Sequence, residues 1–205
     1  MEVKDRVKAV LFDLDETLLK LPVNYEELRE KLRHCASRLN LKFEFRRILE
    51  DIDAASRIAG DDFRRECYEI VESYELEAAM KPIPEQDAAY VLEKLKEGGL
   101  RIGVVSRNSR RCILASLEKL GLTKHVDVII GREDTQRTKP NPEPIIYALK
   151  LLGVEADEAV YVGDHPYDLA AASAAGVTFI AVGDKIRGYG SRVRSLREII
   201  SLISI

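Results

Sequence analysis

The chain has 205 residues, a length that suits one main domain with an inserted module better than two full domains. Its 32 basic and 35 acidic residues leave a formal charge of −3, which argues against a dedicated nucleic-acid binder. Neither a membrane span of roughly 20 apolar residues nor a secretory signal is recognisable, and the widely spaced Cys35, Cys67 and Cys112 favour buried thiols of a cytoplasmic protein over disulfides.

The first expected element is a strand at residues 9–12, an uninterrupted apolar run typical of a strand buried on both faces of a parallel sheet. Asp13 and Asp15 follow on either side of Leu14, and the alternation of side chains along a strand lets the two acids point the same way. Such strand ends form the ligand site of open α/β sheets, and paired carboxylates suit a hard cation such as Mg²⁺. An exposed turn with a helix cap is the alternative interpretation of this acid pair.

Residues 20–81 carry no strand pattern and predict a small helical module. Asn24 and Glu27 mark the start of a first helix. A second helix is expected over residues 45–59, and a third follows the break at Gly60. The prolines that come next indicate a linker, so we expect a core of residues 1–19 and 82–205 interrupted by an all-helical domain at 20–81.

Helices and strands alternate from residue 85 onward. The expected strands are residues 100–105, 126–130, 159–162 and 178–182, and the expected helices are residues 85–97, 109–120, 143–152, 167–175 and 196–203. Strict alternation implies a parallel sheet with right-handed crossovers. The predicted fold class is therefore α/β, a Rossmann-like parallel sheet flanked by helices, with the helical domain inserted into it.

Further polar residues stand where they would meet the first acid pair. Ser106 and Asp164 each follow a predicted strand, and Lys139 precedes a helix whose start is fixed by prolines. Because the carboxyl ends of parallel strands share one edge, these side chains are expected in one cleft, where a lysine reaches a phosphate oxygen. Taken singly, each has an ordinary alternative: a helix-capping serine, a surface lysine and a turn aspartate.

Four segments resemble, in order and spacing, the motifs of the haloacid dehalogenase superfamily, most of whose members are Mg²⁺-dependent phosphatases. They are DLDET at 13–17, VVSRN at 104–108, KPNPEP at 139–144 and VGDHPYD at 162–168. The helical insert resembles the cap of the phosphoglycolate phosphatase-like branch. Glu16 stands where glycine is commonest, and Arg107 stands where asparagine commonly follows the Ser or Thr, so either Arg107 or Asn108 could face the substrate.

The resemblance implies hydrolysis of a small phosphate monoester through an aspartyl-phosphate, with Asp13 as nucleophile, Asp15 as acid and base, and Lys139 as catalytic cation. The implied phosphate-binding residues are Thr17, Ser106, Arg107, Asn108 and Lys139. The implied metal residues, for Mg²⁺, are Asp13, Asp15, Asp164 and Asp168.

A small-molecule phosphate ester is the expected partner, with neither nucleic acid nor a membrane. A phosphomutase of the same fold and a non-catalytic scaffold that binds phospho-ligands are the alternatives.

Overall fold

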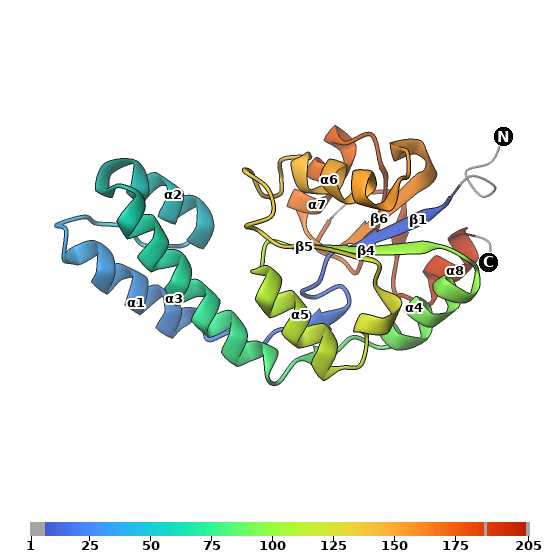
Figure 1. The fold of residues 1–205 in the computed structure, drawn as a ribbon, viewed down its shortest axis with the longest axis horizontal. Coiled ribbons are helices and arrows are strands. Elements are labelled where there is room, and N and C mark those ends of the chain that lie inside the picture. The colour runs from blue at the N-terminus through green and yellow to red at the C-terminus, as the bar shows by residue number, and fades with distance from the viewer. Residues whose placement is uncertain (1–6, 187, 204–205) are drawn as a thin grey trace. The chain divides into compact units, whose positions relative to one another are not determined.

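A computed structural model describes residues 7–186 and 188–203, and the chain divides into two compact units (Figure 1). The helical unit is Pro22–Ala78, and the sheet unit contains the chain up to Leu21 and from Ala79 onward. The helical unit is therefore an insertion between the first strand of the sheet unit and the rest of it.

The sheet unit is built on a parallel sheet with strand order β5-β4-β1-β6-β7-β8. Its strands are β1 (Ala9–Phe12), β4 (Arg101–Val105), β5 (Val128–Ile130), β6 (Ala159–Gly163), β7 (Thr178–Val182) and β8 (Arg192–Val193). β1 lies between β4 and β6, with Leu11 opposite both Gly103 and Tyr161. Every side chain of β1 is fully buried, because neighbouring strands flank it and helices cover both faces.

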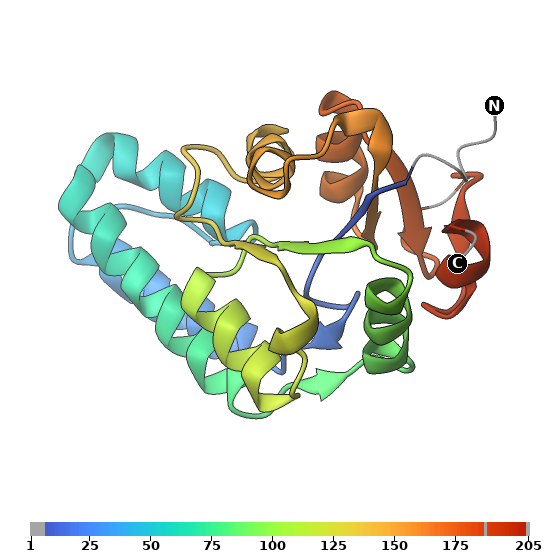
Figure 2. The same cartoon turned by 45° about the vertical axis from the view of Figure 1, so that its right-hand side comes forward.

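Helices cover both faces of the sheet (Figures 1 and 2). α6 (Glu143–Leu152) and α7 (Pro166–Ala174) pack on one face. α4 (Ala88–Glu97), α5 (Arg110–Lys119) and α8 (Glu198–Ile203) lie on the other. The predicted Rossmann-like α/β class is confirmed, and the alternating pattern located each of these helices to within three residues at either end.

Two short strand pairings were not predicted from the sequence. β2 (Leu19–Lys20) and β3 (Ile83–Pro84) form an antiparallel ribbon, and β8 adds a strand at the edge of the main sheet. Two residues are too few to show a period-2 pattern, so the β3 segment was interpreted only as a linker. The ribbon brings the points where the chain leaves and re-enters the sheet unit together, because it pairs Leu19 with Pro84 and Lys20 with Ile83.

The helical unit contains α1 (Tyr25–Ser37), α2 (Ile48–Ala59) and most of α3 (Asp61–Ala79). As predicted, Asn24 caps α1: its side-chain oxygen accepts a hydrogen bond from the Glu27 N–H at 3.2 Å. α2 begins three residues later than expected, because Phe45 adopts a left-handed φ of 51° that a helix does not accommodate. Apolar side chains of all three helices form the buried core of this unit.

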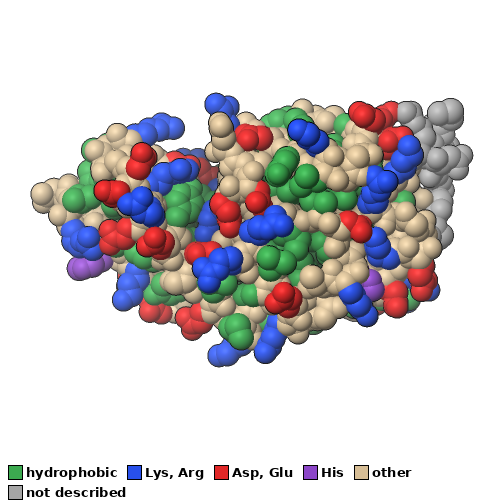
Figure 3. All heavy atoms as spheres, in the orientation of Figure 1, with side chains coloured by type: hydrophobic (Ala, Val, Ile, Leu, Met, Phe, Trp, Pro, Cys, Tyr) green, Lys and Arg blue, Asp and Glu red, His purple; other side chains and the backbone are tan. Residues whose placement is uncertain are grey.

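Cys35, Cys67 and Cys112 are buried thiols that form no disulfide with one another, as the sequence predicted. Within residues 7–186 and 188–203, no helix combines the length and the apolar character needed to cross a membrane. On the face drawn in Figure 3, acidic and basic side chains are interspersed, in keeping with their nearly equal numbers in the chain.

Replacing Pro22–Ala78 by a short Gly/Ser linker should leave a folded sheet unit. The ribbon already holds the two ends of the insertion together, and the main core beside α6 and α7 consists of sheet-unit residues. We expect a single cooperative thermal transition by circular dichroism and a far-UV spectrum that still shows both helix and strand. A truncated chain that melts without a cooperative transition would show that the sheet unit depends on the insertion for its stability.

Candidate active site

The site begins where β1 ends. The Asp13 N–H donates a hydrogen bond to the Val162 carbonyl at 2.9 Å, so the strand ladder continues one residue beyond the apolar run. The Asp13 side chain is 11% exposed, and its Oδ1 lies 2.6 Å from Nζ of Lys139. The backbone of the central strand therefore fixes the position of this carboxylate.

The Lys139 ammonium contacts three polar side chains at the end of β1. Its Nζ lies 2.6 Å from Asp13 Oδ1, 2.6 Å from Asp168 Oδ1 and 2.8 Å from the Tyr161 hydroxyl oxygen. The side chain is only 3% exposed, so its interpretation as a surface lysine is wrong. These three contacts match the three hydrogens of an ammonium group, which leaves the lysine one well-defined position.

Sequence analysis missed Tyr161. Its hydroxyl donates to the Val105 carbonyl at 2.9 Å and accepts from Lys139, which ties β6 to β4 across the central strand. A signal was available, because a hydroxyl within an otherwise apolar buried strand must find a polar partner.

Asp168 is 1% exposed and faces the cluster from the first turn of α7. Its Oδ1 binds Lys139, and its Oδ2 accepts a hydrogen bond from the His165 N–H at 3.0 Å, which caps the helix. The close approach requires glycine at 163, because a Cβ there would lie 2.6 Å from Asp168 Oδ2. One side chain therefore both starts the helix and positions the lysine.

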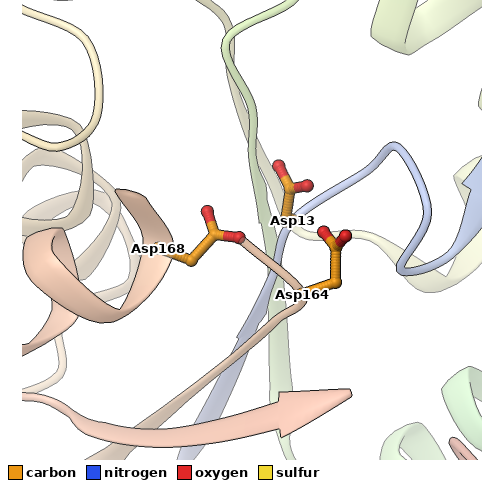
Figure 4. A group of neighbouring side chains, drawn as sticks. All are labelled: Asp13, Asp164 and Asp168. Carbon is orange, nitrogen blue, oxygen red and sulfur yellow. The ribbon is translucent and has the colours of Figure 1, made fainter. Parts of the chain in front are cut away.

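Asp164 completes a group of three carboxylates (Figure 4). One oxygen each of Asp13, Asp164 and Asp168 lies within 4.8 Å of the others, and the three come from the end of β1, the end of β6 and α7. Asp164 Oδ1 accepts a hydrogen bond from the fully buried Thr17 hydroxyl at 3.5 Å. Oxygen donors at this spacing are a set that could hold a metal ion.

The electrostatics of this group favour an added cation. The pKa of Asp13 is raised to about 7, mainly by burial; Lys139 lowers it, and the neighbouring Asp168 raises it. Burial and then Asp13 and Asp168 raise the pKa of Asp164 to about 7. Burial also lowers the pKa of Lys139, but the two carboxylates that it contacts outweigh this effect and raise it. Lys139 is therefore charged, and a further cation beside Asp13 and Asp164 would favour the ionised form of these two buried carboxylates.

The loop after β4 supplies polar groups at the same edge of the sheet. Ser106 is 5% exposed, and its hydroxyl donates to Asn108 Oδ1 at 2.8 Å. Ser106 is not the helix cap, since the Ser109 hydroxyl accepts from Cys112 N–H at the start of α5. In the same loop, the guanidinium of Arg107 lies over the Tyr167 ring, 4.8 Å from its centre.

The turn after Asp13 separates the two acids of the first motif. Asp15 Oδ1 accepts a hydrogen bond from the Leu21 N–H at 2.8 Å, and Asp15 is not one of the three clustered carboxylates. Glu16 has a left-handed φ of 59° and forms an ion pair with Lys185, which also lies 2.6 Å from Asp164. Sequence analysis did not identify Lys185, because no motif marks the loop after β7.

Comparison with known proteins assigns the fold and site to a family. The model of the haloacid dehalogenase-like hydrolases matches residues 10–182, most of the chain and all four motifs. The chain therefore belongs to the haloacid dehalogenase-like hydrolase family and is an enzyme. The expected family resemblance is confirmed.

Individual relatives match along most of their length. The chain is 30% identical over 185 residues to the phosphoglycolate phosphatase of Aquifex aeolicus, covering 83% of this chain and 82% of that protein. It is 29% identical over 190 residues to the pyrophosphatase PpaX of Bacillus velezensis, covering 89% and 86% of the two chains. The crystal structure of a HAD phosphatase from Thermococcus onnurineus superposes with a TM-score of 0.69, at 28% identity and with 97% and 98% coverage.

Gly163→Ala should disable the site by displacing Asp168, because the added Cβ would overlap its carboxylate. Loss of a residue that orients a catalytic group costs about 10–100-fold in activity, and we expect a fall in kcat of that size. Gly190→Ala is the matched control, since a Cβ there meets no atom within 4 Å. Equal kcat values for the two variants would contradict this role of the glycine.

Asp164→Asn should stabilise the metal-free protein more at pH 8 than at pH 5. The pKa of Asp164 rises from 3.8 to about 7 on folding, so the folded chain keeps a proton that the unfolded chain releases in this range. The free energy of unfolding of the wild type therefore falls as the pH rises from about 4 to about 7, whereas asparagine stays neutral and removes this dependence. In EDTA, each kcal/mol gained should raise the unfolding temperature by about 2–4 °C. A larger gain at pH 5 than at pH 8 would refute this pKa shift.

Proposed function

We propose that the chain is a Mg²⁺-dependent phosphatase that hydrolyses a small phosphate monoester through an aspartyl-phosphate on Asp13. The observation that carries this proposal is the Asp13 carboxylate, fixed at the end of the central strand, bound to Lys139 and facing two further carboxylates. Family membership and relatives named phosphoglycolate phosphatase and pyrophosphatase support it. We infer a cytoplasmic location from the three buried cysteines, which remain thiols.

The donor set fits Mg²⁺, because one oxygen from each of three carboxylates lies within 4.8 Å of the others, and hard cations prefer such oxygen donors. Asp13 and Asp164 would hold the ion, together with the backbone carbonyl of Asp15. Asp168 already accepts hydrogen bonds at both oxygens, from Lys139 and His165, so its role is to position the lysine. Bound Mg²⁺ supplies positive charge that offsets the negative charge of the substrate phosphoryl group.

The first step is an in-line displacement at phosphorus. An Asp13 oxygen forms a bond to phosphorus as the bond to the leaving oxygen breaks, and Asp15 gives its proton to that leaving alkoxide. In the second step Asp15 takes a proton from water, which attacks the phosphoryl group and releases phosphate and the free Asp13 carboxylate. Lys139 and Ser106 each exchange one present hydrogen bond for a bond to a phosphoryl oxygen, and they bind these oxygens while charge spreads over them.

The residues around Ser106 extend this phosphate site. The Asn108 side chain, bound to the Ser106 hydroxyl, and the buried Thr17 hydroxyl hold the loops that carry the phosphate ligands. Arg107, stacked on Tyr167, adds a cation near the same strand end. We propose the helical unit as a cap that excludes water and contacts the leaving group.

A phosphomutase and a non-catalytic scaffold are the alternatives to a phosphatase. A phosphomutase would pass the phosphoryl group from Asp13 to a sugar, and a scaffold would bind phospho-ligands without turnover. The presence of Asp13, Asp15, Lys139 and Asp164 favours a catalyst over a scaffold. Assays of p-nitrophenyl phosphate, 2-phosphoglycolate and inorganic pyrophosphate with Mg²⁺ should release phosphate, and EDTA should abolish the release. Absence of turnover with every phosphate compound would favour the scaffold.

Asp13→Asn and Asp15→Asn should fail at different steps. Asp13→Asn removes the nucleophile and should never become phosphorylated. Asp15→Asn keeps the nucleophile, and p-nitrophenyl phosphate has a leaving group that needs little protonation, so the first step should survive in part. Hydrolysis of the intermediate should slow by about 10²–10⁴-fold for a lost general base.

Intact-protein mass spectrometry after rapid quench tests this difference. We expect one added phosphoryl group in Asp15→Asn, mapped to Asp13, and none in Asp13→Asn. Wild-type protein quenched in EDTA is the control for adventitious labelling. A phosphoryl group mapped to Ser106, or unmodified mass in both variants while the wild type turns over, would overturn the assignment of nucleophile and acid.

A further inference from the structure

We propose that Lys185 is a displaceable counter-cation of the metal site, paired with both Asp164 and Glu16 when no divalent ion is bound and left paired with Glu16 alone when an ion binds Asp164. The inference rests on the proposed Mg²⁺ site and adds a residue that sets its affinity. It involves three side chains of the sheet unit, contributed by the turn after β1, the end of β6 and the loop after β7.

The geometry joins one ammonium to two carboxylates. Lys185 Nζ lies 2.6 Å from Asp164 Oδ2 and also pairs with Glu16. The Asp164 side chain is 7% exposed, whereas those of Lys185 and Glu16 are 50% and 39% exposed. Lys185 therefore reaches the buried carboxylate from the solvent side, with its second partner farther out.

The site holds two lysines of opposite character. Lys139 is buried and has three hydrogen-bond partners, so it remains in place when a substrate binds. Lys185 is half exposed and carries its charge on a flexible four-carbon stem, so it can release Asp164 and keep its contact with Glu16 at small cost. Only the second lysine has the freedom to make way for an ion.

Glu16 gives the displaced ammonium a partner. Its left-handed φ of 59° is a backbone conformation that favours glycine, so a glutamate occupies the position against local preference. The side chain that it adds is the one that pairs with Lys185. A divalent ion that binds Asp164 can thus displace the ammonium without leaving it unpaired.

The proposal predicts opposite effects on metal affinity for the two variants. Lys185→Met keeps the apolar stem and removes the competing charge, so the Mg²⁺ dissociation constant should fall, by about tenfold for one charge a few ångströms away. Glu16→Gln removes the remaining partner, so the dissociation constant should rise by roughly threefold. Lys185→Arg keeps the charge and should bind Mg²⁺ close to the wild-type affinity.

Calorimetric titration of the whole protein with MgCl₂, without substrate, measures these constants. Lys8→Met is the matched control, because Lys8 also forms an exposed ion pair, with Glu158, but precedes β1 at the opposite end of the strand. The double variant Glu16→Gln/Lys185→Met separates pairing of the released lysine with Glu16 from direct attraction of the ion by Glu16. With Lys185 absent, the Glu16 substitution should change affinity less than it does alone.

The outcomes distinguish this inference from the function on which it rests. If the wild type binds no divalent ion, or Asp164→Asn leaves binding unchanged, the proposed metal site fails and this inference fails with it. If the wild type binds Mg²⁺ through Asp164 but Lys185→Met binds it equally or more weakly, Lys185 orients Asp164 rather than competing, and only this inference is overturned. The same result follows if Lys8→Met matches Lys185→Met.

Discussion

The contact between the Lys139 ammonium and the carboxylates of Asp13 and Asp168 is the interaction on which the site depends. It joins the end of β1, the segment before α6 and the first turn of α7, which are far apart in sequence. A buried ion pair of this kind costs desolvation free energy that its attraction only partly returns. Its value to the protein is therefore positional: without the lysine, two buried carboxylates would repel each other across the catalytic edge.

Backbone hydrogen bonds help to fix the positions of the buried carboxylates at the carboxyl ends of the strands. The sheet ladder fixes Asp13 through Val162, and the helix cap fixes Asp168 through His165. Asp13 and Asp168 are thus each held by a backbone hydrogen bond as well as by a contact with the Lys139 side chain. Such double support gives the preorganisation that electrostatic catalysis requires, since the groups need not rearrange as charge develops.

Sequence patterns predicted much of this arrangement, for identifiable reasons. The apolar run of β1 located Asp13, and strict alternation of elements implied that Ser106, Lys139 and Asp164 belong to one edge. The alternation of strands and helices did not by itself single out Tyr161 or Lys185. Tyr161 counts as apolar in a strand pattern, although its hydroxyl contacts Lys139, and Lys185 acts through a pairing with Glu16, 169 positions earlier in the numbering. Contacts between distant loops leave no periodic trace.

The β2–β3 ribbon makes the sheet unit tolerant of insertions of different length during evolution. The ribbon pins both ends of the intervening segment, so its length enters the stability of the sheet unit only through loop-closure entropy. Doubling such a loop costs only about 0.6 kcal/mol. Modules of quite different size can therefore replace one another at this junction while the positions of the side chains at the strand ends stay fixed.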